Sequence, residues 1–269
     1  MMLATLGMKM ERIETVRNNP WVDKDIGKRR FLWNMCFCRA DKIIVQTGEQ
    51  RSYFKPSLQR KCTVISNPIS EEFASMEKRY SHRVRKFIAV GRLGAQKNYP
   101  LMIQAFSRAA ADLPDCTLEI YGQGTPEAAE SIKALICQLG MEKRIRLRGW
   151  VRNISQILSK YDAFLMSSDY EGMPNALAEA MATGLVCVST NCRTGPKDMI
   201  EHGCSGYLVS VGNNDAFTEV IKTVLEMEVH ECADMGSAAR ARILDLCSEE
   251  NTLARFIALV ESRTTSKGC

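Results

Sequence analysis

The chain has 269 residues, of which 45% are hydrophobic and 25% charged, and a net charge of +5. These values are typical of a soluble globular protein with one large or two modest domains. The small, dispersed positive charge suits an anionic ligand or a membrane surface and argues against a nucleic-acid-binding protein. No segment approaches the run of about 20 apolar residues that a membrane-spanning helix needs.

Eleven cysteines and three histidines are the candidate metal ligands of the chain. The cysteines form no C-x-x-C pair, and their odd number and irregular spacing fit neither a disulfide framework nor a zinc site. We interpret them as reduced thiols that act as small hydrophobic side chains, which indicates a cytoplasmic protein. The histidines lie far apart in the sequence, so no histidine-based metal site is expected.

Short apolar runs alternate with helical patterns along the chain. The sequence predicts strands over 43–46, 63–65, 87–90, 117–121, 145–147, 163–166, 185–188 and 207–209. It predicts helices over 49–54, 98–111, 126–139, 154–160, 174–183, 196–201 and 215–227, and a helical segment that continues to 266. Strict alternation of strand and helix is typical of a parallel, doubly wound α/β sheet.

Composition divides this pattern into parts. Residues 1–67 carry too few repeats for a full sheet and predict a partial α/β domain, whereas residues 86–248 predict a complete Rossmann-like domain. The segment 68–85 between them is polar and basic, and we interpret it as a linker whose basic run over 78–86 is solvated. Residues 249–269 are expected to form a C-terminal helix. The first ten residues resemble the end of a helix that begins further upstream.

The segment 170–184 carries the most informative motif. Pro174 suits the first position of a helix, and Gly184 suits the position just past its end. Backbone N–H groups in the first turn of such a helix form a phosphate site, and here they belong to Asn175, Ala176 and Leu177. Glu171 precedes the helix and Glu179 follows eight positions later. A phosphate between two acids indicates a nucleotide-sugar, although an ordinary amphipathic helix gives the same pattern.

Other polar and glycine-rich loops also follow predicted strands, where ligands bind in parallel sheets. Gly91 and Arg92 end one strand, and Lys97 precedes the next helix, so the two cations could neutralise a diphosphate without a metal. The alternative is that both are solvated surface charges. Gly122 follows another strand and could let the backbone approach a base, while Trp150 could line the same pocket or pack in the core.

Together, these motifs resemble the C-terminal half of glycosyltransferase family 4, retaining enzymes of the GT-B fold with two Rossmann-like domains facing each other. The matching motifs are G-R-x(4)-K-N from Gly91, Y-G-x-G from Tyr121, E-G-x-P-N-x(3)-E-A-M-A-x-G from Glu171, and G-P at Gly195. The resemblance extends from about 87 to 224. It continues more weakly upstream through 17–20, 40–47 and 64–69, which are similar to the end of the family's N-terminal, acceptor-side domain.

The resemblance implies specific roles for the site residues. Arg92 and Lys97 would bind the donor diphosphate and stabilise the leaving nucleotide, and Glu171 would contact hydroxyls of the transferred sugar. Glu179 would bind the ribose hydroxyls. The remaining donor contacts would come from Gly91, Gly122, Trp150 and the amides of Asn175, Ala176 and Leu177. Members of the family usually need neither a metal nor another cofactor.

The implied function is transfer of a sugar from a nucleotide-sugar, with UDP expected as the nucleotide, to a glycan or lipid-linked acceptor in surface polysaccharide or glycolipid biosynthesis. Only about 67 residues precede the expected hinge, which leaves the acceptor side incomplete. We favour a fragment of a longer enzyme over a complete short protein that lacks efficient transfer. The alternative function is a non-catalytic module that binds a nucleotide-sugar or a partner.

Residues 28–37 mix cations with aromatic side chains. One interpretation is peripheral contact with the inner face of the cell membrane, where a lipid-linked acceptor would lie. The other is a helix whose apolar face packs on the sheet.

Overall fold

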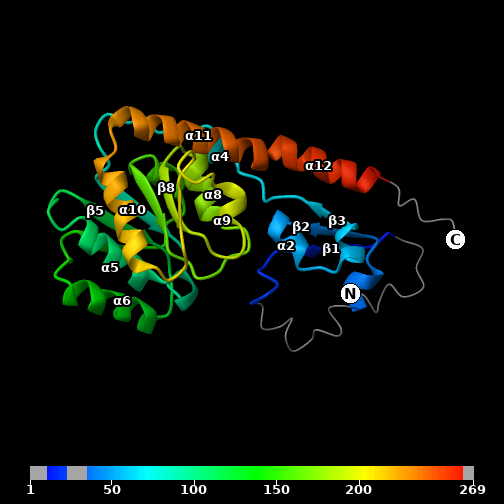
Figure 1. The fold of residues 1–269 in the computed structure, drawn as a ribbon, viewed down its shortest axis with the longest axis horizontal. Coiled ribbons are helices and arrows are strands. Elements are labelled where there is room, and N and C mark those ends of the chain that lie inside the picture. Colours follow the sequence, from blue (N-terminus) through cyan, green and yellow to red (C-terminus); the bar gives the residue numbers. More distant parts are fainter. Residues whose placement is uncertain (1–10, 23–34, 263–269) are drawn as a thin grey trace.

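The structure is a computed structural model that describes residues 11–22 and 35–262. Two sheets, both parallel, form its framework (Figure 1). The larger sheet has the order β6-β5-β4-β7-β8-β9 and the smaller sheet the order β1-β2-β3. The strands are β1 (Ile13–Val16), β2 (Lys42–Val45), β3 (Cys62–Val64), β4 (Lys86–Val90), β5 (Thr117–Tyr121), β6 (Ile145–Gly149), β7 (Ala163–Met166), β8 (Val186–Thr190) and β9 (Tyr207–Val209). The predicted Rossmann-like α/β fold is confirmed.

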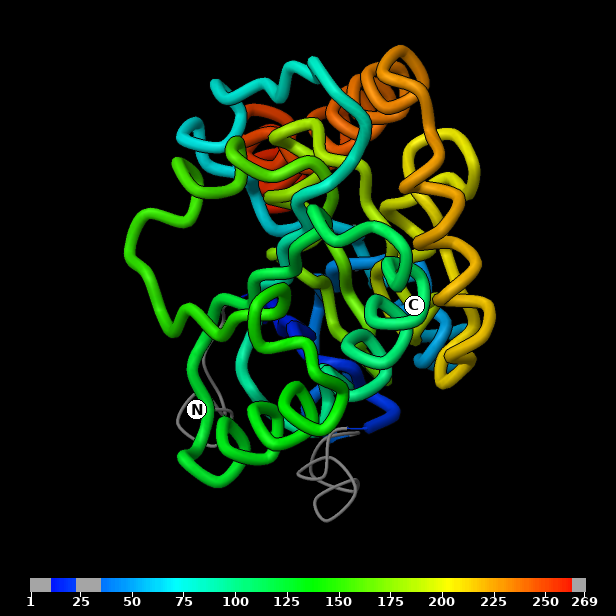
Figure 2. Tube along the Cα trace, turned by 90° about the vertical axis from the view of Figure 1, so that its left-hand side faces the viewer, coloured from blue at the N-terminus to red at the C-terminus, as the bar shows by residue number. Residues whose placement is uncertain are grey.

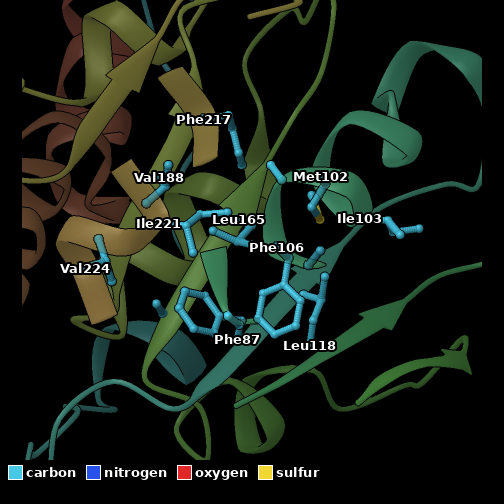
Figure 3. Close-up of a cluster of buried hydrophobic side chains, with 14 of the residues drawn as sticks. Phe87, Met102, Ile103, Phe106, Leu118, Leu165, Val188, Phe217, Ile221 and Val224 are labelled. Atoms are coloured by element: carbon cyan, nitrogen blue, oxygen red, sulfur yellow. The ribbon is translucent and has the colours of Figure 1, made fainter. Parts of the chain in front are cut away.

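Both faces of the larger sheet are buried because successive side chains along a strand point to opposite sides. Phe87 belongs to one hydrophobic cluster and its neighbour Ile88 to another. The first cluster joins the sheet to α5 (Tyr99–Ala109), α6 (Pro126–Gln138) and α10 (Asn214–Glu226), and Figure 3 shows Phe106 beside Phe87 within it. The second joins the sheet to α4 (Glu71–Ala74), α7 (Ser155–Leu158), α8 (Asn175–Ala182) and α9 (Pro196–Met199).

Two helices at the end of the described chain connect the two sheets. The helical segment predicted there is divided in two, because Ser248 separates α11 (Val229–Cys247) from α12 (Glu249–Glu261). Ser248 caps the second helix, which begins at the residue expected for the C-terminal helix, by accepting from the Asn251 amide. In Figure 1 these helices, orange to red, run along the upper side of the molecule from the larger sheet toward the smaller one, and they lie at the top of the view in Figure 2 as well. Leu259 of α12 packs with Ile44 and Ile65 of the small sheet.

The other face of the small sheet packs against the short helices α2 (Gly48–Ser52) and α3 (Pro56–Gln59) and against the helical residues 35–39. Strand β1 was not predicted. It is a four-residue strand at the edge of this sheet and pairs only with β2 among the described strands. The helix predicted at the start of the chain and most of the aromatic, cationic segment 28–37 lie outside the described residues.

The solvated character predicted for 78–86 holds only in part, because five of its nine residues are exposed while others are fixed by contacts with the larger sheet. Asp162, 1% exposed, accepts from the Lys78 ammonium at 2.8 Å and from the backbone amides of Arg85 and Lys86 at 3.0 and 2.9 Å. The Tyr80 hydroxyl donates to the carbonyl oxygen of the same aspartate. This carboxylate therefore fastens the basic segment and the start of β4 to the residue that directly precedes β7.

Across the described ranges, no helix combines the length and the apolar character that crossing a membrane requires.

Candidate donor site

The candidate site lies where the strand order of the larger sheet reverses. Strand β4 is the first of this sheet in the sequence, and its neighbours β5 and β7 lead the chain to opposite sides of the sheet. In such sheets, the crevice at the carboxyl ends of the two central strands is the usual ligand site. Here that crevice is formed by the loop 91–98 after β4 and the loop 167–174 after β7, and these loops contain the predicted residues Gly91, Arg92, Lys97 and Glu171.

A short polar network joins the two loops. The Lys97 ammonium lies 2.6 Å from the Glu171 carboxylate, which also accepts from the Ser168 hydroxyl at 2.6 Å and from the Gln96 amide at 3.3 Å. Glu171 is buried, and burying a charge without such partners would be costly. The network thus holds one cation and one anion at fixed positions in the crevice.

Arg92 stands between two cavities. The first, about 460 Å³, is mainly apolar and runs past Tyr121 and Gly122 to Trp150. The second, about 440 Å³, is mainly polar and contains Glu171 and Gln96. Arg92 lines both, and its side chain is exposed and makes no hydrogen bond or ion pair with any other described residue. An unpaired guanidinium between an apolar and a polar cavity suits a ligand with a planar group, a central phosphate and a polyhydroxyl group.

Trp150 is 60% exposed, so the alternative that it packs in the core is wrong. It lies at the end of β6 and forms one side of the apolar cavity.

The loop after the neighbouring strand β4 explains why residue 122 is a glycine. Its φ is +148°, and a Cβ there would lie 1.8 Å from the carbonyl oxygen of Gly91. The loops after β4 and β5 can therefore touch only because Gly122 has no side chain. We expect Gly122→Ala to lower the free energy of unfolding by about 2–3 kcal/mol and to abolish ligand binding at the apolar cavity.

The matched control is Gly140→Ala, because Gly140 also has a positive φ (+65°) but faces open space. It should lower stability by only about 1 kcal/mol and leave binding intact. Urea denaturation and calorimetry measure both effects, and equal losses in the two variants would contradict this account.

The segment 17–22 after β1 closes the polar cavity from the side of the small sheet. Asn19 donates from its side-chain amide to the carbonyl oxygen of Arg193, which also accepts from the Glu171 amide at 3.2 Å. The Arg193 guanidinium lies 3.7 Å from the ring centre of Trp21 and pairs with Glu49 at 2.9 Å. The loop after β8 therefore joins the backbone of Glu171 to residues of the small sheet.

Helix α8 differs slightly from the prediction. It begins at Asn175, with Pro174 in the capping position, and Gly184 has the expected positive φ of +81° just past its end. The expectation of a free amide at Leu177 is wrong, because this amide donates to the carbonyl oxygen of Pro174 at 3.1 Å, as in a tight first turn. The amides of Asn175 and Ala176 remain as the candidate phosphate donors.

Glu179 is partly buried on the same helix and lines neither of the two cavities. Burial raises the pKa of its carboxyl group, and the nearby carboxylate of Glu72 raises it further. No hydrogen bond from another described residue satisfies this side chain. Its environment therefore disfavours the charged form unless hydrogen-bond donors, such as hydroxyls, approach it.

Sequence reasoning gave no specific role to three contributors to the site. Gln96 and Ser168 hold Glu171, and Asn19 holds the loop after β8. Ser168 had a usable signal, since a polar residue directly after a buried strand lies at the carboxyl end of the sheet. Asn19 lies in the weaker upstream match over 17–20, but no local pattern indicates its contact, which joins residues 174 positions apart.

Comparisons with known proteins identify the family of the chain. Residues 72–242 match the family model described as glycosyl transferases group 1. A Methanocaldococcus jannaschii protein described as an uncharacterized glycosyltransferase is 34% identical over 60% of this chain and 42% of its own length. The Campylobacter jejuni N-acetylgalactosamine-N,N'-diacetylbacillosaminyl-diphospho-undecaprenol 4-alpha-N-acetylgalactosaminyltransferase is 29% identical over 73% of this chain and 54% of its own length.

Among solved structures, Anabaena HepE in complex with UDP superimposes with a TM-score of 0.85 over 97% of this chain and 75% of its own, at 18% identity. This likeness supports the GT-B type of fold. The chain spans about half the length of the curated relatives it matches. The family model covers more than half of the chain, and the chain therefore belongs to the glycosyl transferases group 1 family.

Proposed function

We propose that this chain carries the donor site of a retaining glycosyltransferase of family 4 that uses a UDP-sugar. The observation that carries the proposal is the position of Arg92, unpaired between an apolar and a polar cavity at the reversal point of the sheet. The uracil would occupy the apolar cavity beside Trp150, the diphosphate would contact Arg92, and the sugar would enter the polar cavity. There its hydroxyls would meet the Glu171 carboxylate.

Lys97 has two partners in this scheme. In the structure it neutralises Glu171 at 2.6 Å, and a bound diphosphate would compete for the same ammonium. The diphosphate would leave toward Arg92 and Lys97, and the acceptor hydroxyl would attack from the side that it vacates. Two cations that stabilise the developing charge would make a metal unnecessary, as is usual in the resembling family.

The acceptor is proposed to be a glycan or a lipid-linked sugar. The Campylobacter relative is named for a diphospho-undecaprenol acceptor, which supports the lipid-linked class. We place the protein in surface polysaccharide or glycolipid assembly on the cytoplasmic side of the membrane.

Calorimetric titration with UDP in the presence of EDTA tests the donor site. We expect saturable binding without a metal, and we expect Arg92→Ala to weaken it about 10- to 100-fold because a charged hydrogen bond is lost. Arg108→Ala is the matched control, since Arg108 is an exposed arginine that pairs with Asp215 on the outer surface. No UDP binding by the folded chain, or equal affinity in both variants, would contradict the proposal.

A further inference from the structure

A third cavity lies under α12, beside the polar donor cavity. It measures about 340 Å³, and its walls are mainly apolar, with Ile44 and Ile65 from the small sheet and Phe256 from α12. Its size falls in the range of small-molecule sites. None of the residues assigned to donor binding lines it. The cavity is thus separate from the donor site, although it opens beside it.

Two residues in the wall of this cavity each have a buried polar atom without a partner. Gln46 is 3% exposed, and its side-chain carbonyl oxygen accepts no hydrogen bond from any described residue. The hydroxyl of Thr252 is also unpaired within the described part of the chain. Both residues line the cavity. A buried polar atom without a partner costs about 1–3 kcal/mol, so a hydrogen-bond partner brought to either side chain would be stabilising.

Arg17 connects this cavity with the donor site. It lines both this third cavity and the polar cavity that contains Glu171. Its guanidinium donates to the Asn67 side chain at 3.0 Å and is paired with no described carboxylate. Arginine is well suited to phosphate, so an anionic group at Arg17 would join a polyhydroxyl group on one side to an apolar group on the other.

The apolar surface continues beyond the cavity along α12. Leu253 and Phe256 line the cavity and are partly exposed, and the exposed side chains of Ile257 and Val260 follow on the same helix. Residues three and four positions apart lie on one face of a helix. A chain too long for the cavity could therefore extend over this face.

We propose that this cavity binds the lipid end of the acceptor, with its phosphate at Arg17 and its first apolar units between the small sheet and α12. The inference rests on the proposed function, because it places the sugar end of the acceptor at the donor site. Gln46 and Thr252 would contact polar atoms next to the phosphate. The orphaned atoms, the arginine and the apolar face all fit one amphiphilic molecule.

Farnesyl diphosphate is a water-soluble probe of this chemistry. It is titrated into the chain after saturation with UDP, so that the donor site is closed to its diphosphate. We expect one binding site, which inorganic pyrophosphate alone does not fill. Arg17→Gln should weaken farnesyl diphosphate about 10-fold or more and leave farnesol unaffected. Phe256→Ala should weaken both, while Leu139→Ala, at an exposed apolar residue of another helix, should change neither.

Thr252→Val separates a ligand contact from a structural role. It removes only an unpaired hydroxyl, so we expect the urea midpoint to rise while the affinity for farnesyl diphosphate falls about fivefold. No binding by a chain that binds UDP would overturn this inference and leave the donor site standing. Pyrophosphate binding as tight as that of the probe, or equal affinity in all variants, would also overturn it. A chain that fails to bind UDP but binds the probe would overturn the proposed donor site alone.

Discussion

Replacing Asp162 with alanine should lower the free energy of unfolding by about 3–5 kcal/mol, because it leaves the Lys78 ammonium as an uncompensated, mostly buried charge. The same change also removes the acceptor for the amides of Arg85 and Lys86. These three contacts hold the segment that leads into β4, so the loss should be global and cooperative. Urea denaturation followed by circular dichroism measures it.

The control is Asp115→Ala. Asp115 also pairs with a cation, Arg85 at 2.9 Å, but its side chain is 63% exposed. Exposed ion pairs contribute at most about 1 kcal/mol, so this variant should unfold close to the unmodified chain. A difference of less than about 1 kcal/mol between the two variants would mean that the segment 78–86 is held mainly by other contacts.

Exchanging the two glutamates of the donor motif for glutamine should separate their roles. Glu171→Gln should leave the affinity for UDP within a few-fold, because it frees Lys97 for the diphosphate. It should weaken a UDP-sugar about 10- to 100-fold, since charged hydrogen bonds to the sugar hydroxyls are lost. Glu179→Gln should weaken the binding of UDP and UDP-sugar alike, because both ligands carry the ribose whose hydroxyls Glu179 is expected to bind. Calorimetry with UDP, UDP-glucose, UDP-galactose and UDP-N-acetylglucosamine measures these differences.

Stability provides a second test of Glu179. Its pKa is raised in the folded chain by burial and by Glu72, so the folded state binds the proton more tightly than the unfolded state does. Stability is then lost as the pH rises from the ordinary glutamate pKa through the raised value. Glu179→Gln should therefore be more stable than the unmodified chain at pH 7, and the difference should vanish below about pH 4.

Two outcomes would contradict this division of roles. One is an equal loss of UDP and UDP-sugar affinity in both glutamine variants. The other is a Glu179→Gln variant that is less stable than the unmodified chain at neutral pH. That result would mean that the carboxylate has a stabilising partner outside the described residues.

The sequence was sufficient to predict those elements whose local pattern of apolar residues agrees with their burial in the fold. The apolar runs 117–121, 163–166 and 207–209 are bounded by turn residues, and they coincide with β5, β7 and β9. Because ligands bind at the carboxyl ends of parallel strands, placing Arg92 and Glu171 in one crevice required only the order of the elements.

It was insufficient where a partner distant in the sequence decides the outcome. Lys78 looks like a solvated linker charge until Asp162, 84 positions away, is brought beside it. The short strand β1 exists because β2 pairs with it, and four residues with one buried position give little periodicity. The tight first turn of α8, which occupies the Leu177 amide, depends on backbone geometry that composition does not encode.

The return of α12 to the small sheet has a consequence for synthesis of the chain. Lys42 donates to carbonyl oxygens at the end of α12, one of them 217 positions later, and Leu259 covers Ile44 and Ile65. A ribosome makes the small sheet before the larger domain and the helix that covers it after that domain. The nascent chain must therefore carry an uncovered apolar sheet face while the whole larger domain is made, and in this interval chaperone binding or misassembly competes with folding.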